Sequence, residues 1–268
     1  MMDNLEGLKS ARTAHRVVTL SLKVLMKRLL VAALTASALL AGRASARAEF
    51  VSYDTTGAWN GSNSISSFGA GTSNTATYGE TFVAPSGGGS LLKDFSFHIK
   101  PSLGVHLQMH AYVYAWTGPL MGHGGRATGS ALYTSPTVIL DGNGSFQTVT
   151  FGPTADVLLP GQNYVAFLTV SNPDDYAKYQ ATGVSSATFF GLVATPHPAG
   201  NGGGGFVYAN NTSDFASLTS STWTTVSDRG DLAWTAEFEV VPEPGTLMLS
   251  AFAAGTLGLV ALWRRRRD

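Results

Sequence analysis

The sequence contains no cysteine, so disulfide bonds, thiol nucleophiles and thiolate metal sites are all excluded. Only 13% of its residues are charged, and no G-x-S-x-G motif marks the nucleophile of a serine hydrolase. Signals for helices are scarce outside the two ends of the chain. A protein with this sequence must therefore gain its stability from an apolar core, and no sequence motif announces a catalytic activity.

The formal net charge of zero hides an uneven distribution of charge along the 268 residues. Residues 1–48 carry eight basic and two acidic residues. Residues 49–240 carry five basic and 13 acidic residues, which gives this central part a net charge of −8 (five minus 13). Because nucleic-acid binding needs a basic surface, nucleic acid is not expected as a partner. Both ends are expected to be sorting elements around one domain of roughly 190 residues.

The C-terminal segment 241–268 combines three features in a fixed order. Two prolines flank one acid, and this short segment must be extended because proline lacks a backbone N–H and disfavours helix in the preceding residue. Residues 245–263 carry no charge, and as a helix they reach roughly 28 Å, close to the bilayer core of about 30 Å. Four arginines follow and are expected to stay on the cytoplasmic side. We therefore predict one transmembrane helix over 245–263, with a buried core helix as the alternative.

This tail resembles a PEP-CTERM sorting signal. The matching residues are the motif Pro242, Glu243 and Pro244 and the basic end Arg264, Arg265, Arg266 and Arg267. The resemblance implies that an exosortase in the inner membrane reads the tail, with cleavage near the motif as a further expectation. It also implies a Gram-negative bacterium that makes exopolysaccharide. The same tail is also classified as an ice-binding protein C-terminal domain, a label that describes the tail alone and implies no ice binding.

The N-terminal region has the pattern of a Sec signal peptide over residues 26–48. Two basic residues after Met26 precede about 12 apolar residues, and small residues at alternate positions then offer signal peptidase sites. The mature chain is expected to begin near Arg47 or Glu49. Residues 1–25 are then a misassigned leader, and translation starts at Met26. A long signal n-region or an amphipathic helix is the alternative for this leader.

From residue 49 onward, short apolar runs alternate with stretches rich in glycine, serine, threonine and asparagine, which is typical of an all-β domain. The expected strands are Glu49–Asp54, Glu80–Ala84, Leu91–Lys100, Val105–Trp116, Ala131–Tyr133, Thr137–Leu140, Ser145–Phe151, Asn163–Ser171, Thr188–Val193, Gly205–Ala209 and Asp231–Val240. Residues 57–77 are expected to form a long loop with at most one weak strand. Asp141-Gly142-Asn143-Gly144 has the composition of a hairpin turn. This pattern predicts an antiparallel, two-sheet β-sandwich of jelly-roll type over residues 49–240.

The expected strand 105–116 presents two different faces. Its odd-numbered residues are apolar and suit the core, whereas its even-numbered residues are aromatic or polar. Tyr112, Tyr114 and Trp116 are therefore candidates for an exposed face that stacks on sugar rings. The alternative is that these rings pack under a neighbouring loop, or that the strand breaks in two.

Other residues give weaker indications of chemistry. His106 and His110 lie about 13 Å apart along one strand, too far to share a metal ion. Glu237 and Glu239 share a strand face, as paired carboxylates do in glycosidases, but solvated acids are the simpler explanation. Asp174-Asp175 is a candidate calcium ligand pair without the spacing of an EF-hand. The glycine runs 87–89 and 202–205 lead into strands, so they lack the helix N-terminus that binds phosphate and are expected to be flexible loops.

These observations together predict a non-enzymatic exported protein of the cell surface or extracellular matrix. Sec would export it, the C-terminal helix would hold it in the inner membrane with the domain outside the cytoplasm, and an exosortase would sort it. No catalytic residue, metal or cofactor is expected. A carbohydrate-binding module for exopolysaccharide is the first alternative, and a secreted polysaccharide hydrolase is the second.

Overall fold

The computed structural model describes residues 49–70, 75–86, 88–121, 123–153, 157–175, 188–193, 203–225, 230–242 and 255. One compact unit extends from Ala48 to Pro242. The predicted leader 1–25 and signal peptide 26–48 lie outside the described residues. So do Glu243, Pro244, Arg264–Arg267 and, apart from Gly255, the predicted membrane helix 245–263.

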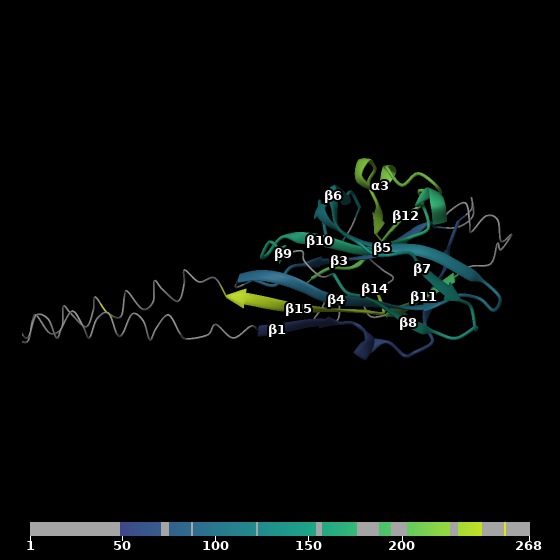
Figure 1. The fold of residues 1–268 in the computed structure, drawn as a ribbon, viewed down its shortest axis with the longest axis horizontal. Helices are drawn as coiled ribbons and strands as arrows, with labels where there is room; N and C mark the ends of the chain where they lie inside the picture. The colour runs from purple at the N-terminus through teal and green to yellow at the C-terminus, as the bar shows by residue number, and fades with distance from the viewer. Residues whose placement is uncertain are drawn as a thin grey trace, which may run out of the picture. The chain divides into compact units, whose positions relative to one another are not determined.

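Two antiparallel sheets packed face to face make up the domain, which is the all-β sandwich that the sequence predicts (Figure 1). The first sheet has eight strands among the described residues, in the order β1-β15-β4-β11-β14, with β2 paired to β11 and with β8 and β9 paired to β4. Its strands are β1 Glu49–Asp54, β2 Ser64–Phe68, β4 Gly88–Lys100, β8 Gln147–Phe151, β9 Val157–Leu158, β11 Thr188–Val193, β14 Asp231–Leu232 and β15 Trp234–Pro242.

The second sheet has seven strands in the described part of the chain, in the order β13-β12-β3-β10-β5-β6, with β7 paired to β5. Its strands are β3 Thr77–Val83, β5 His106–Thr117, β6 Arg126–Thr134, β7 Val138–Asp141, β10 Asn163–Thr169, β12 Phe206–Ala209 and β13 Thr224–Thr225. A 3-10 helix, η1, spans Thr56–Ala58, and a short α-helix, α3, spans Ser217–Ser220.

The main core lies between the two sheets and follows the alternation seen in the sequence. In β5, the apolar odd-numbered residues from Leu107 to Val113 are buried in this core, as predicted. In β15, Trp234 and Phe238 are buried, whereas Glu237 on the other face is partly exposed. The period of two therefore identifies correctly which face of each long strand packs inward.

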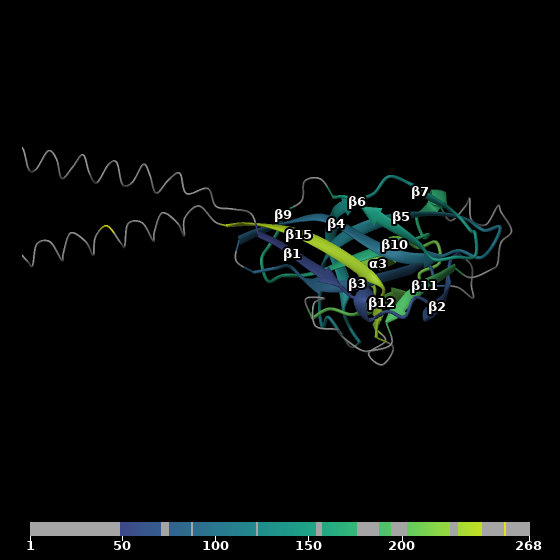
Figure 2. The same ribbon diagram turned by 90° about the horizontal axis from the view of Figure 1, so that it is seen from below.

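A second apolar cluster covers the outer face of the seven-stranded sheet. It joins β5 and β10 to the segment around α3, which lies over this sheet in Figure 1 and overlaps the same strands in the view of Figure 2. Phe215, Leu218 and Trp223 supply the cover. The sheet is therefore buried on both faces here, in agreement with the alternative that the rings of the strand 105–116 pack under a neighbouring segment.

One local prediction is corrected by the structure. Residues 141–144 do not close a hairpin, because β7 pairs with β5 in one sheet and β8 pairs with β4 in the other. Their backbone instead binds the turn before β5: Gly142 N–H donates to Val105 O at 2.7 Å, and Gly104 N–H donates to Gly142 O at 3.1 Å. The described residues of the expected loop 57–77 agree with its prediction: they contain the last two residues of η1 and one strand, β2, before β3 begins at Thr77.

Candidate functional site

The outer face of β5 separates into an aromatic half and a polar half. The even-numbered residues from His106 to His110 are polar, and those from Tyr112 to Trp116 are aromatic. Both halves lie on the side of the seven-stranded sheet that faces away from the main core. Because a strand alternates its side chains without interruption, one strand carries both surfaces side by side.

The aromatic half is closed to solvent. Tyr112, Tyr114 and Trp116 are only 5%, 7% and 5% exposed. The ring of Phe215 lies 5.0 Å from that of Tyr112, and the ring of Trp223 lies 5.6 Å from that of Trp116. Burial raises the pKa of the Tyr112 and Tyr114 hydroxyls. The prediction of an exposed stacking face is therefore wrong, and the alternative, in which the rings pack under a neighbouring segment, is confirmed, because the α3 segment covers them.

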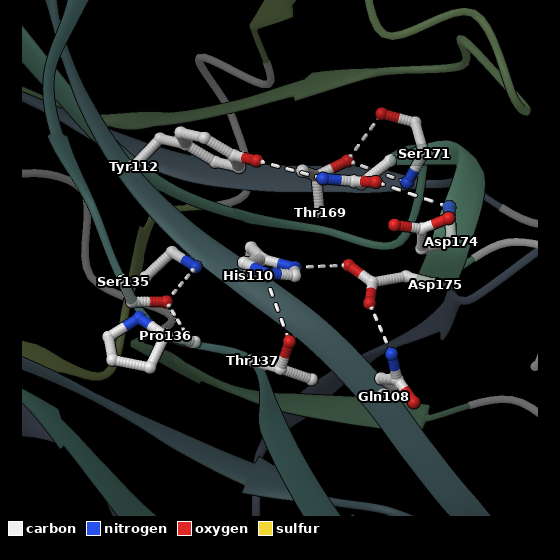
Figure 3. A network of polar contacts seen from close by, with 12 residues as sticks. Gln108, His110, Tyr112, Ser135, Pro136, Thr137, Thr169, Ser171, Asp174 and Asp175 are labelled. Carbon is white, nitrogen blue, oxygen red and sulfur yellow. Dashed lines mark hydrogen bonds and ion pairs between the residues drawn. The ribbon is translucent and has the colours of Figure 1, made fainter.

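The polar half contains a buried carboxyl group that binds two side chains of β5 (Figure 3). Asp175 follows β10 and has no exposed surface. Its Oδ1 accepts a hydrogen bond from Gln108 Nε2 at 2.8 Å, and its Oδ2 lies 2.5 Å from His110 Nδ1. These bonds hold the segment that follows β10 against β5 and keep the imidazole ring in one orientation.

A hydroxyl group faces the other nitrogen of the same imidazole. Thr137 Oγ1 lies 3.2 Å from His110 Nε2, and Thr137 is exposed (Figure 3). Thr137 precedes β7, and the register of β5 and β7 ends at the pair Met109 and Val138. The next pair in this register joins His110 to Thr137. The side chains of Thr137, His110 and Asp175 therefore form a continuous chain of polar contacts from solvent to interior.

The sequence marks His110 and Asp175 as separate candidates, but it does not show that their side chains are in contact. They are 65 residues apart, and Thr137 is 27 residues from His110. No spacing motif links the three, so only the strand register could have revealed the arrangement. The proposed calcium pair is divided in the structure: Asp174 is exposed and its backbone N–H donates to Asn172 Oδ1 at 3.2 Å, whereas Asp175 is turned inward.

Two other histidines in the described part of the chain, His98 and His106, have partners of different kinds. His106 Nδ1 lies 2.5 Å from the carboxylate of Asp141 at the surface, and His98 Nδ1 lies 3.3 Å from Thr148 Oγ1. Within the described ranges, no group of three or more histidine, aspartate or glutamate side chains is close enough to hold a metal ion.

The pair Glu237 and Glu239 lies on the outer face of the eight-stranded sheet. Glu239 forms an ion pair with Lys93 at 3.1 Å. Glu237 is opposite Asp94, and the pKa of Asp94 is raised by partial burial and by the charge of Glu237. The two glutamates therefore have different partners and do not face each other across a cleft.

The sorting motif begins where the domain ends. β15 lies between β1 and β4 and extends as far as Pro242, whose register partner is Gly88. Val241 and Pro242 are extended, as their proline content predicts. The described parts thus define a class of protein, an all-β sandwich domain whose last strand, β15, directly precedes the C-terminal segment.

The comparison with protein families identifies that segment. Residues 240–267 match the model of the PEP-CTERM protein-sorting motif, so the chain carries this motif at its C-terminus. The match includes Pro242, Glu243 and Pro244 and the four arginines 264–267. Neither the curated proteins nor the solved structures contain a match to this chain. Among the residues that the structure describes, no helix is long and apolar enough to cross a membrane.

Proposed function

We propose that this chain is a non-enzymatic protein of the cell surface or extracellular matrix, exported by Sec and sorted by an exosortase. The family match at 240–267 carries the proposal, because that motif is associated with exosortase-dependent sorting of exported proteins. The apolar run 245–263 is proposed as the membrane anchor, with Arg264–Arg267 as its cytoplasmic stop. Residues 26–48 are proposed as the Sec signal peptide.

The position of the motif relative to the domain supports processing by a membrane protease. β15 is paired with β1 as far as Val240 and with β4 as far as Pro242, where the compact domain ends. The two prolines prevent the motif from continuing as a helix or pairing fully as a strand. An extended segment of this kind fits the groove of a peptidase or transpeptidase.

The composition of the domain supports a place outside the cell. It has no cysteine whose redox state would have to be controlled, and its central part carries a net charge of −8 (five basic and 13 acidic residues). A net charge far from zero favours solubility and opposes non-specific association. Burial of apolar residues on both faces of the seven-stranded sheet supplies the stability that a domain without disulfide bonds needs.

Exopolysaccharide binding, the alternative function, needs a surface other than the one predicted for it. Tyr112, Tyr114 and Trp116 are covered by the α3 segment, so their faces are closed to sugar rings. A glycan array probed with the purified protein tests the alternative. Binding to an exopolysaccharide would favour the carbohydrate-binding module over a purely structural component.

The experiment that tests sorting compares two strains, one with an exosortase and one in which the exosortase gene is deleted. The mass of the mature protein is measured in each strain. We expect the wild-type chain to lose its C-terminal residues only in the strain with the exosortase, and to be found with the envelope or matrix. The variant Glu243→Ala should retain the tail, whereas the matched control Glu239→Ala, four residues upstream on β15, should be processed normally. A mature protein that extends to Asp268 in both strains would refute the proposal.

A further inference from the structure

Three histidines of the domain, His98, His106 and His110, differ in their hydrogen-bond partners. His98 has a hydroxyl neighbour, Thr148, and its ring has no hydrogen bond to a carboxylate among the described residues. His106 has a carboxylate neighbour, Asp141, and its ring has no hydrogen bond to a hydroxyl in the same part of the chain.

His110 has both kinds of neighbour, one on each nitrogen of its ring. Asp175 contacts Nδ1 and Thr137 contacts Nε2. When a carboxylate orients a base and that base faces a hydroxyl group, the base can activate the hydroxyl group as a nucleophile. His110 is therefore the one histidine of the three whose surroundings match this chemistry.

The partners of His110 favour the tautomer in which Nδ1 carries the proton. Asp175 is fully buried, and its Oδ1 accepts a hydrogen bond from Gln108 Nε2. In this tautomer Asp175 Oδ2 accepts a hydrogen bond from the Nδ1–H of the imidazole. Nε2 then presents its lone pair, and the hydroxyl of Thr137 donates to it. The hydroxyl oxygen remains at the exposed end of this chain of bonds.

We propose that Thr137 is a site of covalent O-acylation by activated carboxylic esters, with His110 as the general base and Asp175 as the residue that positions it. In the reaction, Thr137 Oγ1 forms a bond to the acyl carbon while its proton moves to His110 Nε2. The bond between the acyl carbon and the leaving oxygen then breaks, and the leaving group takes the proton from His110. The products are an acyl-threonine ester and a free alcohol, and the atoms balance without any further reactant.

This inference goes beyond the sorted surface protein proposed above and does not depend on the tail. It describes a single covalent modification of the domain and requires no turnover. A positioned general base accelerates such a step by roughly 10²–10⁴-fold over an unassisted hydroxyl. Thr148 provides an internal reference, because its hydroxyl faces His98 and that ring lacks a hydrogen-bonded carboxylate in the described structure.

The experiment exposes the purified full chain to p-nitrophenyl acetate and measures acetyl groups at each threonine by peptide mass spectrometry. We expect acetylation of Thr137 to exceed that of Thr148 by at least about tenfold. Thr137→Val should remove the label from this position without other change, because Thr137 is exposed. Thr137→Ser should restore it, because the variant keeps a hydroxyl. Equal labelling of Thr137 and Thr148 in the wild-type chain would overturn the proposal.

Two further variants separate the base from the residue that positions it. His110→Gln removes the base, and Asp175→Asn should favour the wrong tautomer of the imidazole. Each is expected to lower labelling of Thr137 by at least about tenfold while leaving Thr148 unchanged, a difference that a general loss of structure would not produce. Near-UV circular dichroism checks that each variant is folded. A folded His110→Gln variant with unchanged labelling of Thr137 would contradict the assigned role of His110. If either variant fails to fold, the wild-type ratio of Thr137 to Thr148 still decides.

Discussion

The carboxyl groups of Glu80, on β3, and Asp231, on β14, meet in the interior of the sandwich, where neither side chain is exposed. Burial and the nearby charge of Asp231 raise the pKa of Glu80 well above its usual value, although the backbone N–H of Leu232 donates to Glu80 Oε2 at 3.1 Å. The folded domain therefore retains the proton on Glu80 to a higher pH than the unfolded chain does.

The raised pKa of Glu80 predicts that the domain loses stability as the pH rises. The stabilising contribution is complete below the unfolded pKa of about 4.3 and is lost progressively as the pH rises toward the folded pKa. Through that window the free energy of unfolding should fall by about 1.4 kcal/mol per pH unit. Glu80→Gln should remove this slope, because glutamine can accept the Leu232 hydrogen bond and donate to Asp231 at every pH.

Urea unfolding of both proteins between about pH 5 and about pH 9 measures this effect. Glu239→Gln is the control, because Glu239 lies on the outer face of the sheet with Lys93 as its partner. That variant should keep the wild-type slope. Identical slopes in the wild-type protein and in Glu80→Gln would show that Glu80 is ionised in the folded state.

The covered aromatic face leads to a prediction about stability. Trp116 packs edge to face against Trp223, and its indole N–H donates to Pro119 O at 2.9 Å. Trp116→Ala should therefore lower the free energy of unfolding by about 3–5 kcal/mol, the usual cost of truncating a buried tryptophan. Leu103→Ala is the control, because Leu103 is 82% exposed, and it should change stability by less than about 0.5 kcal/mol. Thermal or urea unfolding measures both, and equal stability of wild type and Trp116→Ala would mean that the ring is not packed.

The strands could largely be predicted from the sequence, because alternation marks the face that is buried. The long strands β4, β5, β10 and β15 all lie where short apolar runs predict them. The two-residue strands β9, β13 and β14 are too short to show a period, and two of them, β9 and β13, were not predicted. The sheet to which a strand belongs could not be predicted either, because alternation shows which face of a strand is buried but not which strand pairs with it. β7 and β8 are examples. The jelly-roll type of connection stays a prediction.

The candidate site was predicted less well than the fold. The sequence marks the polar residues of β5, but exposure depends on what packs over them. Tyr112 and Trp116 have the same local pattern whether solvent or the α3 segment covers them. The meeting of His110 with Asp175 depends on how β10 and β5 are aligned. The sorting motif of the tail differs from this site, because it consists of consecutive residues and can be identified from the sequence alone.

A substitution at Gly204 tests how closely the segment just before β12 packs against β3. A Cβ atom built on Gly204 would lie 1.4 Å from the backbone oxygen of Thr81, so any side chain must push the two strands apart. This glycine is buried, which corrects the expectation of a flexible loop at this position of the run 202–205. Gly204→Ala should destabilise the domain by about 3 kcal/mol. Gly57→Ala, where a Cβ meets nothing within 4 Å, should leave stability unchanged or raise it by up to about 1 kcal/mol. Urea unfolding compares the two, and a neutral Gly204→Ala would indicate that β12 and β3 separate easily.

The hydroxyl of Thr55 joins the end of β1 to the point where β14 passes into β15. It donates to Leu232 O at 2.6 Å and accepts from Trp234 N at 2.9 Å, and Thr55 has no exposed surface. Thr55→Val keeps the size of the side chain but leaves that N–H and that carbonyl without the hydroxyl. Because an unsatisfied buried group costs about 1–3 kcal/mol, the variant should lose that amount of stability.

Thr56→Val is the matched control for this position. Thr56 makes its side-chain hydrogen bond at the surface, with Asp54 Oδ1 at 2.6 Å, so water can replace the partner and the loss should stay below about 0.5 kcal/mol. Amide hydrogen exchange offers a second measurement: in Thr55→Val the N–H of Trp234 should exchange faster, while residues of β10 should be unaffected. Because β15 ends at Pro242, the first residue of the motif, this variant also tests whether recognition of the motif depends on the stability of the strand. If Thr55→Val is destabilised as expected yet still processed by the exosortase, recognition depends on the extended segment and not on the anchoring of the strand before it.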